Sequence, residues 1–150
     1  MNLSSVIAPQ DVIPALSAAT KSTLIDMLSD HAARRTGLDA QKIRAALLGR
    51  ERLGSTGIGD GVAVPHAPMA GLEAPFAALA ILRKPIDFEA VDDQPVDIVF
   101  LLLSPAGGSG DYLKILAAVA RRTRDQKTLG LLRSATTAED ACSVLTGQAG

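Results

Sequence analysis

A glycine-rich stretch that ends in a histidine, residues 54–66, is the part of this sequence best suited to chemistry. It reads GSTGIGDGVAVPH, with four glycines in its first eight residues. Glycine allows successive backbone N–H groups to turn inward, so such a stretch can form a cradle for an anion. Residues 62–64 predict a short buried strand, which Pro65 would end because it donates no ladder hydrogen bond. His66 is therefore expected where a strand gives way to a loop, beside a candidate anion site.

His66 could act as a nucleophile toward phosphorus. An unperturbed imidazole titrates near about pH 6.5, so at pH 7 one ring nitrogen mostly offers a lone pair. Phosphoryl transfer then needs little beyond alignment and charge stabilisation. A histidine after a strand is also often structural, and the residue types alone leave both interpretations open. The groups expected to hold the phosphoryl oxygens are the backbone N–H groups of Gly57, Gly59 and Gly61, the hydroxyl of Ser55 or Thr56, and the guanidinium of Arg50 or Arg52.

Rival motifs fail at this stretch. A Walker loop needs a lysine before Ser or Thr, and no lysine lies between Lys42 and Lys84. The dinucleotide fingerprint fails because the glycines lead into an apolar strand. No G-x-S-x-G elbow marks a serine hydrolase. His66 has no neighbouring histidine or cysteine at ligand spacing, so we expect neither a metal nor a cofactor.

Composition limits the class of protein and its partners. The chain has 150 residues, which predicts a single domain spanning residues 1–150. The formal net charge is −1 and aromatic residues make up 3%, which argues against a nucleic-acid partner. No apolar run approaches the roughly 20 residues of a membrane helix and no signal peptide is visible, so we expect a cytoplasmic protein without membrane insertion. The single cysteine, Cys142, is expected to be a small buried residue.

Capping residues predict helices in both halves of the chain. Thr20 is a candidate N-cap for a helix that ends at Gly37, and Asp39 is a candidate for the next helix. Thr137 is expected to cap the last helix. His31, on the first helix, is expected to be solvated.

Another helix is expected to begin with Asp111 as its N-cap. Its apolar spacing predicts an inner stripe that consists of Leu113, Leu116, Ala117 and Ala120.

The continuous apolar run of residues 76–82 predicts a central strand that is covered on both faces. Residues 96–103, which are apolar except for Asp97, predict the strongest strand of the chain. Residues 12–14 could form a short edge strand. Residues 67–71 and 104–110 have the composition of loops. Helices precede, interleave with and follow the strands, which predicts an α/β domain with helices on both faces of a small sheet.

Residues 50–66, RERLGSTGIGDGVAVPH, closely resemble the active-site segment of the enzyme IIA domains of the bacterial phosphotransferase system, in the fructose/mannitol class. The form GSTGIG in a stand-alone chain looks most like the nitrogen-regulatory members. The resemblance continues through residues 92–100 and the helix that contains Leu113, and it covers the chain from residue 3 to about residue 146. It implies a three-layer α/β/α sandwich with a mixed sheet. It also implies that His66 is the phosphorylated residue, with Arg50 near it.

The resemblance implies partners as well. The donor would be an HPr-like phosphocarrier protein, and the phosphorylation state would regulate targets such as potassium transporters or sensor kinases. Two alternatives stay open. One is a sugar-transport enzyme IIA that passes the phosphoryl group to a fructose or mannitol IIB domain. The other is an interaction module that binds a partner or a small anion without chemistry.

One position departs from the family pattern. The family usually carries a histidine-leucine pair at the start of the helix after the main strand, and here the pair is Tyr112-Leu113. Tyrosine can donate or accept a hydrogen bond but is not a cation near neutral pH. Two interpretations stay open. In one, the change slows phosphotransfer or alters the stability of the phosphohistidine. In the other, Tyr112 simply packs over the site.

An apolar docking surface for the donor is expected around His66. A charge introduced by Met69→Glu is expected to slow phosphotransfer without unfolding the protein. The candidate docking residues are Ile58, Ala67, Pro68, Met69 and Tyr112.

Overall fold

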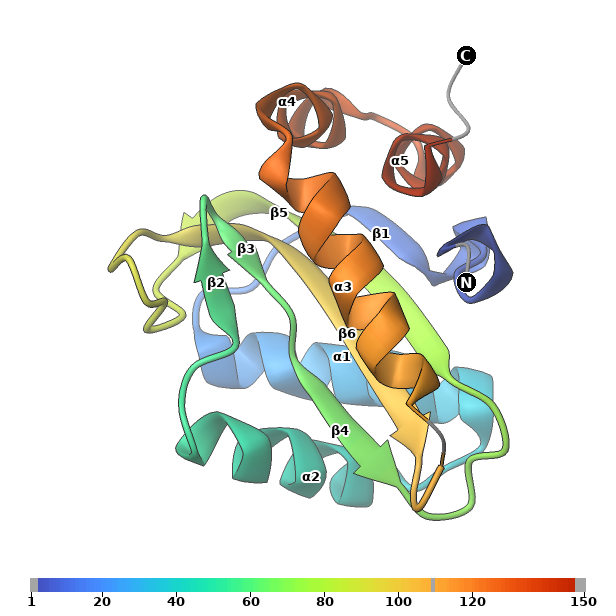
Figure 1. Cartoon of the computed structure of the whole chain (residues 1–150). Coiled ribbons are helices and arrows are strands. Elements are labelled where there is room, and N and C mark those ends of the chain that lie inside the picture. The colour runs from blue at the N-terminus through green and yellow to red at the C-terminus, as the bar shows by residue number, and fades with distance from the viewer. Residues whose placement is uncertain (1–2, 109, 148–150) are drawn as a thin grey trace.

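A mixed β-sheet with helices on both faces makes up the computed structural model, which describes residues 3–108 and 110–147 (Figure 1). The strands are β1 (Val12–Leu16), β2 (Gly57–Gly59), β3 (Val62–Ala63), β4 (His66–Met69), β5 (Phe76–Ile86) and β6 (Val96–Pro105). The sheet order is β1-β5-β6-β3-β2, and β4 also pairs with β6. β5 runs antiparallel to β6, whereas β3 and β4 both run parallel to it.

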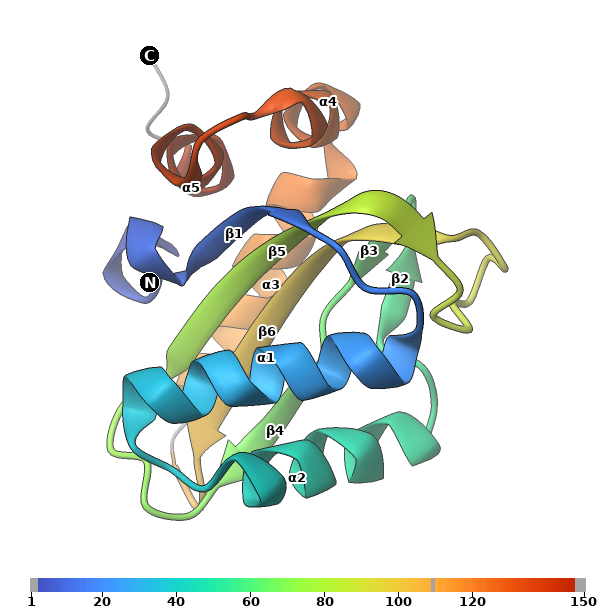
Figure 2. The same cartoon turned by 180° about the vertical axis from the view of Figure 1, so that it is seen from behind.

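The helices form two outer layers, as Figures 1 and 2 show from opposite sides. The pair α1 and α2 covers one face, and α3 with α4 and α5 covers the other. This arrangement confirms the predicted three-layer α/β/α sandwich. The helices are α1 (Lys21–Thr36), α2 (Ala40–Arg52), α3 (Asp111–Arg124), α4 (Gln126–Ser134) and α5 (Ala138–Thr146), with short 3₁₀ turns at Leu3–Ser5 and Pro9–Asp11.

The middle parts of β5 and β6, residues 76–82 and 98–103, are apolar without interruption because each face of the sheet has its own core. In β6, Phe100 and Leu102 pack in the cluster that includes α3, α4 and α5. The intervening Leu101 and Leu103 pack in the cluster that includes α1 and α2. Successive side chains of a strand point to opposite faces, so both sets must be apolar.

Three of the four predicted helix caps are confirmed. The Thr20 and Asp39 side chains accept hydrogen bonds from the backbone N–H groups at the start of α1 and α2. Thr137 does the same for α5. Gly37 ends α1 in the left-handed conformation with φ of 78°.

The predicted inner stripe of α3 was wrong. Leu113 and Ala117 are exposed, and Leu116 and Ala120 are half-buried. Apolar residues occupy more than half of this helix, so spacing alone did not decide which face turns inward. Gly110, not Asp111, is the N-cap residue. The buried residues are Ile115, Ala118, Val119 and Thr123.

Strands extend beyond their predicted limits. The residues after His66 form β4 and not a loop, and β5 continues past residue 82 through Pro85 to Ile86. Pro85 is exposed. Pro14 lies in β1 at the edge of the sheet, where its missing N–H group is tolerated.

His31 is not a solvated histidine, contrary to expectation. Its Nε2 atom lies 2.8 Å from Oδ1 of Asp11, and the same oxygen accepts a hydrogen bond from Arg35. Asp11 is buried, so this group joins α1 to the N-terminal segment through a carboxylate that water hardly reaches.

Cys142 is buried in the core on the α5 side, as expected, and burial raises the pKa of its thiol. Within the described residues, no helix combines the length and apolar character needed to cross a bilayer.

Candidate functional site

His66 is the first residue of β4. β3 and β4 pair one after the other with the same edge of β6. β3 pairs with Ile98 and Val99, and β4 resumes the pairing at Leu102. Pro65 lies at the interruption and accepts a hydrogen bond from the Leu102 N–H group at 3.0 Å. The expectation that the strand gives way to a loop at His66 was therefore wrong. The histidine is held within the sheet.

The His66 ring has one nitrogen fixed by the backbone. Its Nδ1 atom lies 2.8 Å from the carbonyl oxygen of Val64. Because a carbonyl can only accept, Nδ1 must carry the proton in this contact. In the neutral ring, Nε2 then has the lone pair. This is the tautomer that a nucleophile acting through Nε2 requires.

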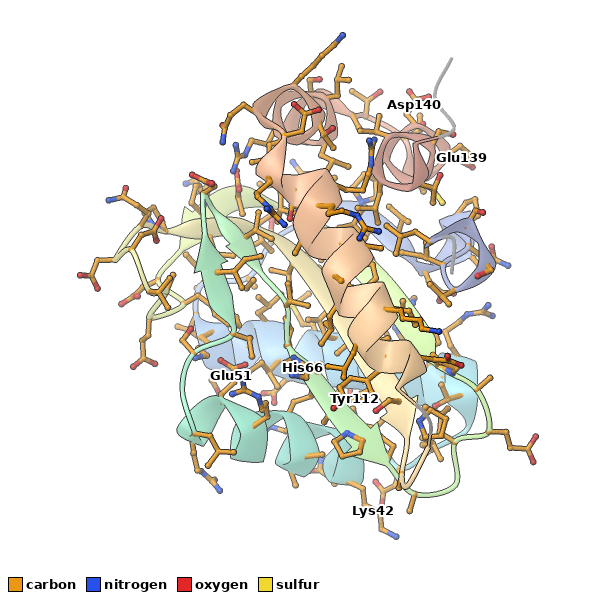
Figure 3. The ribbon with its side chains drawn as sticks, in the orientation of Figure 1. Lys42, Glu51, His66, Tyr112, Glu139 and Asp140 are labelled. Carbon is orange, nitrogen blue, oxygen red and sulfur yellow. The ribbon has the colours of Figure 1, made fainter. Side chains whose placement is uncertain are left out.

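The half-buried His66 side chain lines two adjacent cavities, and Arg50 lines both of them as well. The larger cavity has a volume of about 400 Å³ and the smaller about 240 Å³. Besides Arg50 and His66, the larger is lined by Ala67, Pro68, Ser104, Pro105, Gly107, Gly108 and Tyr112, and the smaller by Ser55, Thr56, Ile58, Val64, Leu116 and Ala120. Figure 3 shows Tyr112 of α3 beside His66.

Arg50 is the cation that the structure brings to His66. It lies in the last turn of α2, and its Nη1 group donates to the Gly54 carbonyl at 2.9 Å. Among the described residues, no carboxylate pairs with it. Its charge is therefore free to meet an anion. Arg52, the other arginine considered, lines neither cavity and lies against a different hollow near Lys21.

The glycine stretch is not the expected anion cradle. Gly57 and Gly59 pair with β3 in a hairpin, and the turn between the strands contains Gly61 with φ of 81°. Gly61 lies against Arg133 and Asp97, at the end of the hairpin where β3 begins. Neither Gly59 nor Gly61 lines a cavity with His66. These glycines are required for a turn and for close packing.

The hydroxyl groups of Ser55 and Thr56 are also committed elsewhere. Ser55 donates to the Phe88 carbonyl at 2.8 Å and accepts from the Gly57 N–H group. Thr56 donates its hydroxyl proton to Glu51. Both residues line the smaller cavity, but neither hydroxyl has a proton left for a phosphoryl oxygen in this arrangement.

The second glycine-rich segment, after β6, contributes to the site instead. Gly107 and Gly108 line the larger cavity with His66, as do Ser104 and Tyr112. The composition of this segment indicated a loop but not its position. Its proximity to His66 depends on the parallel pairing of β4 with β6, which brings Met69 opposite Pro105.

The predicted docking residues divide into exposed and buried members. Ile58 is 48% exposed, and Pro68 is exposed in the middle of β4. Met69 is only 6% exposed and Ala67 only 3%, because both pack in the core on the α1 and α2 side. Their side chains cannot serve as docking contacts, and Met69→Glu would place a charge in the core. Leu113 was predicted to lie on the inner face of its helix, but it is 58% exposed at the start of α3.

Comparison with known proteins identifies the family of the chain. The family model described as "Phosphoenolpyruvate-dependent sugar phosphotransferase system, EIIA 2" matches residues 5–147. The chain belongs to this enzyme IIA family. The enzyme IIA chain is 43% identical over 145 residues to a nitrogen regulatory protein of Bradyrhizobium diazoefficiens, covering 97% of this chain and 95% of that protein.

Two further comparisons support the assignment. The crystal structure of nitrogen regulatory protein IIA-Ntr from Neisseria meningitidis superposes with a TM-score of 0.92 at 28% identity, covering 96% of this chain and 99% of the other. A fructose-specific EIIA component of Haloferax volcanii is 39% identical over 104 residues, 69% of this chain and 68% of that protein. The enzyme IIA chain is thus a phosphotransferase-system component, most like the nitrogen-regulatory members.

Proposed function

We propose that this enzyme IIA is a phosphohistidine carrier that accepts a phosphoryl group on Nε2 of His66 from an HPr-like phosphocarrier protein. One observation carries the proposal. The Nδ1–H group of His66 donates to the Val64 carbonyl, so the lone pair is on Nε2. The ring lines two cavities with an arginine that has no carboxylate partner in the described part of the chain.

The chemistry requires little from the protein beyond position and charge. The Nε2 lone pair forms a new N–P bond while the N–P bond of the donor's phosphohistidine breaks, and the donor ring takes back that electron pair. His66 leaves the reaction with its proton still on Nδ1, where the Val64 carbonyl accepts it. The guanidinium of Arg50 offsets the negative charge on the phosphoryl oxygens.

The donor would dock on the exposed apolar residues around the cavities. Ile58, Pro68 and Leu113 come from three different elements, and all three are exposed. The half-buried Tyr112, next to Leu113 in the chain, lines the larger cavity. Adding a phosphoryl group here would place a strong negative charge within an apolar surface and so change which partners it binds.

The proposed output is regulatory. The similarity to nitrogen regulatory proteins over nearly the whole chain supports this role. Targets such as potassium transporters or sensor kinases would distinguish the phosphorylated form from the free form. The match to a fructose-specific EIIA component supports a second candidate, in which the phosphoryl group passes to a IIB domain.

Phosphotransfer from phosphoenolpyruvate through enzyme I and an HPr-like protein tests the proposal. Wild type and His31→Gln should both acquire an acid-labile, base-stable phosphoryl group, whereas His66→Ala should acquire none. His31 is the other histidine of the chain, so it is the matched control. Arg50→Lys should still be labelled, but about tenfold more slowly, because lysine lacks the bidentate fork.

Each alternative makes a different prediction in the same assay. Rapid onward transfer to a fructose or mannitol IIB domain would favour sugar transport over regulation. Labelling of neither wild type nor His31→Gln would favour a module without chemistry.

A further inference from the structure

Glu51 forms hydrogen bonds with Thr56, which is joined in turn to Val64 near His66. It follows Arg50 in the last turn of α2, but its side chain is only 5% exposed and faces away from solvent. Its carboxylate accepts from the Thr56 N–H group at 3.1 Å and from the Thr56 hydroxyl. It also pairs with the ammonium group of Lys21 at 2.8 Å. In Figure 3, Glu51 and Tyr112 lie on opposite sides of His66.

The hydrogen bonds continue from Thr56 to the histidine through the backbone. The Thr56 carbonyl accepts from the Val64 N–H group at 2.9 Å. The Val64 carbonyl in turn accepts from His66 Nδ1 at 2.8 Å. Thr56 is thus held by Glu51 on its N–H side and by Val64 on its carbonyl side. Val64 is held by Thr56 at its N–H group, and its own carbonyl contacts the His66 ring.

We propose that Glu51 is a positioning residue for His66, acting through Thr56 and Val64 to keep Nδ1 protonated and Nε2 available. The proposal rests on the proposed function for its catalytic consequence, but its structural part concerns the free protein alone. Glu51 lines neither of the two cavities at His66, and the hydrogen bonds described for its carboxylate go to Thr56 and Lys21, so it would act through other residues.

A carboxylate suits this position better than other side chains. Both of its oxygens accept hydrogen bonds, and here they meet three donor groups. A glutamine amide offers one oxygen and an NH₂ group, and the NH₂ group would face another donor. Lys21 supplies the balancing charge, and its ammonium lies 4.4 Å from the Phe88 ring centroid. A buried carboxylate without such a partner would be strongly unfavourable.

The test compares Glu51→Gln with Asp11→Asn. Asp11 is the matched control because its side chain is a carboxylate of similar burial, 7% exposed, that also holds two basic side chains. It lines neither cavity at His66. Both variants should lose stability in denaturant unfolding. The decisive readout is the ¹⁵N NMR spectrum of the His66 ring in the unphosphorylated protein, which reports the tautomer.

Glu51→Gln should populate both tautomers of His66 and slow phosphoryl acceptance about tenfold, as expected for a misplaced reacting group. Asp11→Asn should keep the Nδ1–H tautomer and the wild-type rate. If Glu51→Gln retains the pure Nδ1–H tautomer, the proposal is wrong, whatever happens to the transfer rate. If wild type is not phosphorylated on His66, the proposed function fails, but the tautomer comparison still decides the role of Glu51.

A second variant covers the case in which Glu51→Gln does not fold. Thr56→Val removes the hydroxyl bond to Glu51 and keeps the backbone N–H bond. It should shift the tautomer ratio in the same direction by a smaller amount. An unchanged ring spectrum in Thr56→Val would then count against the proposal.

Discussion

Two glycine-rich segments lie near His66, and they have different roles in the structure. Residues 54–61 contain β2, which pairs with β3 in a hairpin, and polar groups of Ser55, Thr56 and Gly57 bond within the fold. Residues 104–108 end β6 and line the larger cavity. Similar composition therefore has two outcomes. The first segment is bonded within the fold, and the second lines the cavity at His66.

This contrast predicts that a small change in the first segment costs stability. A Cβ at Gly57 would lie 2.7 Å from Cβ and 2.9 Å from Cα of Ala90, which is buried. Gly57→Ala should lower the free energy of unfolding by about 2 kcal/mol, as overpacking does. Gly130→Ala is the control, since Gly130 lies in α4 with nothing within 4 Å of its added Cβ. It should raise stability by about 0.5–1 kcal/mol because alanine favours the helix. Equal losses in both variants would contradict the contrast.

The second segment should respond in transfer and not in stability. Gly107 has φ of 69° and nothing within 4 Å of an added Cβ. Asparagine tolerates this conformation, so Gly107→Asn should unfold within about 0.5 kcal/mol of wild type. Its side chain would partly fill the cavity and slow phosphoryl acceptance roughly fivefold. A normal transfer rate in a normally folded variant would show that the cavity does not receive the phosphoryl group.

Variants of Tyr112 test whether the larger cavity also protects phosphorylated His66 from water. Its half-buried ring lines the larger cavity. Tyr112→Ala should shorten the lifetime of the phosphohistidine about threefold, because water gains access to the site. Tyr112→Phe keeps the ring and should keep the lifetime. If Tyr112→Phe shortens the lifetime as much as Tyr112→Ala does, the hydroxyl group and not the packing of the ring protects the phosphohistidine.

Asp125 lies outside both segments and should show the smallest effect. The Thr128 hydroxyl, which donates to its carboxylate at the start of α4, lowers the pKa of Asp125 below its ordinary value of 3.8. The charged form therefore stabilises the native state above pH 3.8, and this contribution is lost as the pH falls through the lower native pKa. Asp125→Asn should flatten that part of the acid-unfolding curve slightly and leave transfer unchanged. An unchanged curve would mean that solvent screens the interaction.

Local signals in the sequence predicted much of the fold. Thr20, Asp39 and Thr137 cap helices because each carries a short acceptor side chain at a helix start. The two central strands were predictable because each contains a run of at least six apolar residues, 76–82 and 98–103, which suits a strand covered on both faces. His66 stood out by its position after the strand and the proline.

The errors came from contacts between distant segments. β4 looked like a loop because Pro68 interrupts it, yet pairing with β6 holds it as a strand. The residue types suggested Arg50 or Arg52 at the site, and only the family resemblance favoured Arg50 and drew attention to Tyr112. Glu51 was missed entirely, since its role depends on Thr56 and Val64 being brought together by the hairpin.

The most direct test of the account is the position of the phosphoryl group on the ring. Phosphorylated, ¹⁵N-labelled protein should show one-bond coupling between phosphorus and Nε2 of His66, with the proton remaining on Nδ1. Coupling to Nδ1, or to His31, would contradict the central claim, because the Val64 carbonyl would then not set the reacting nitrogen.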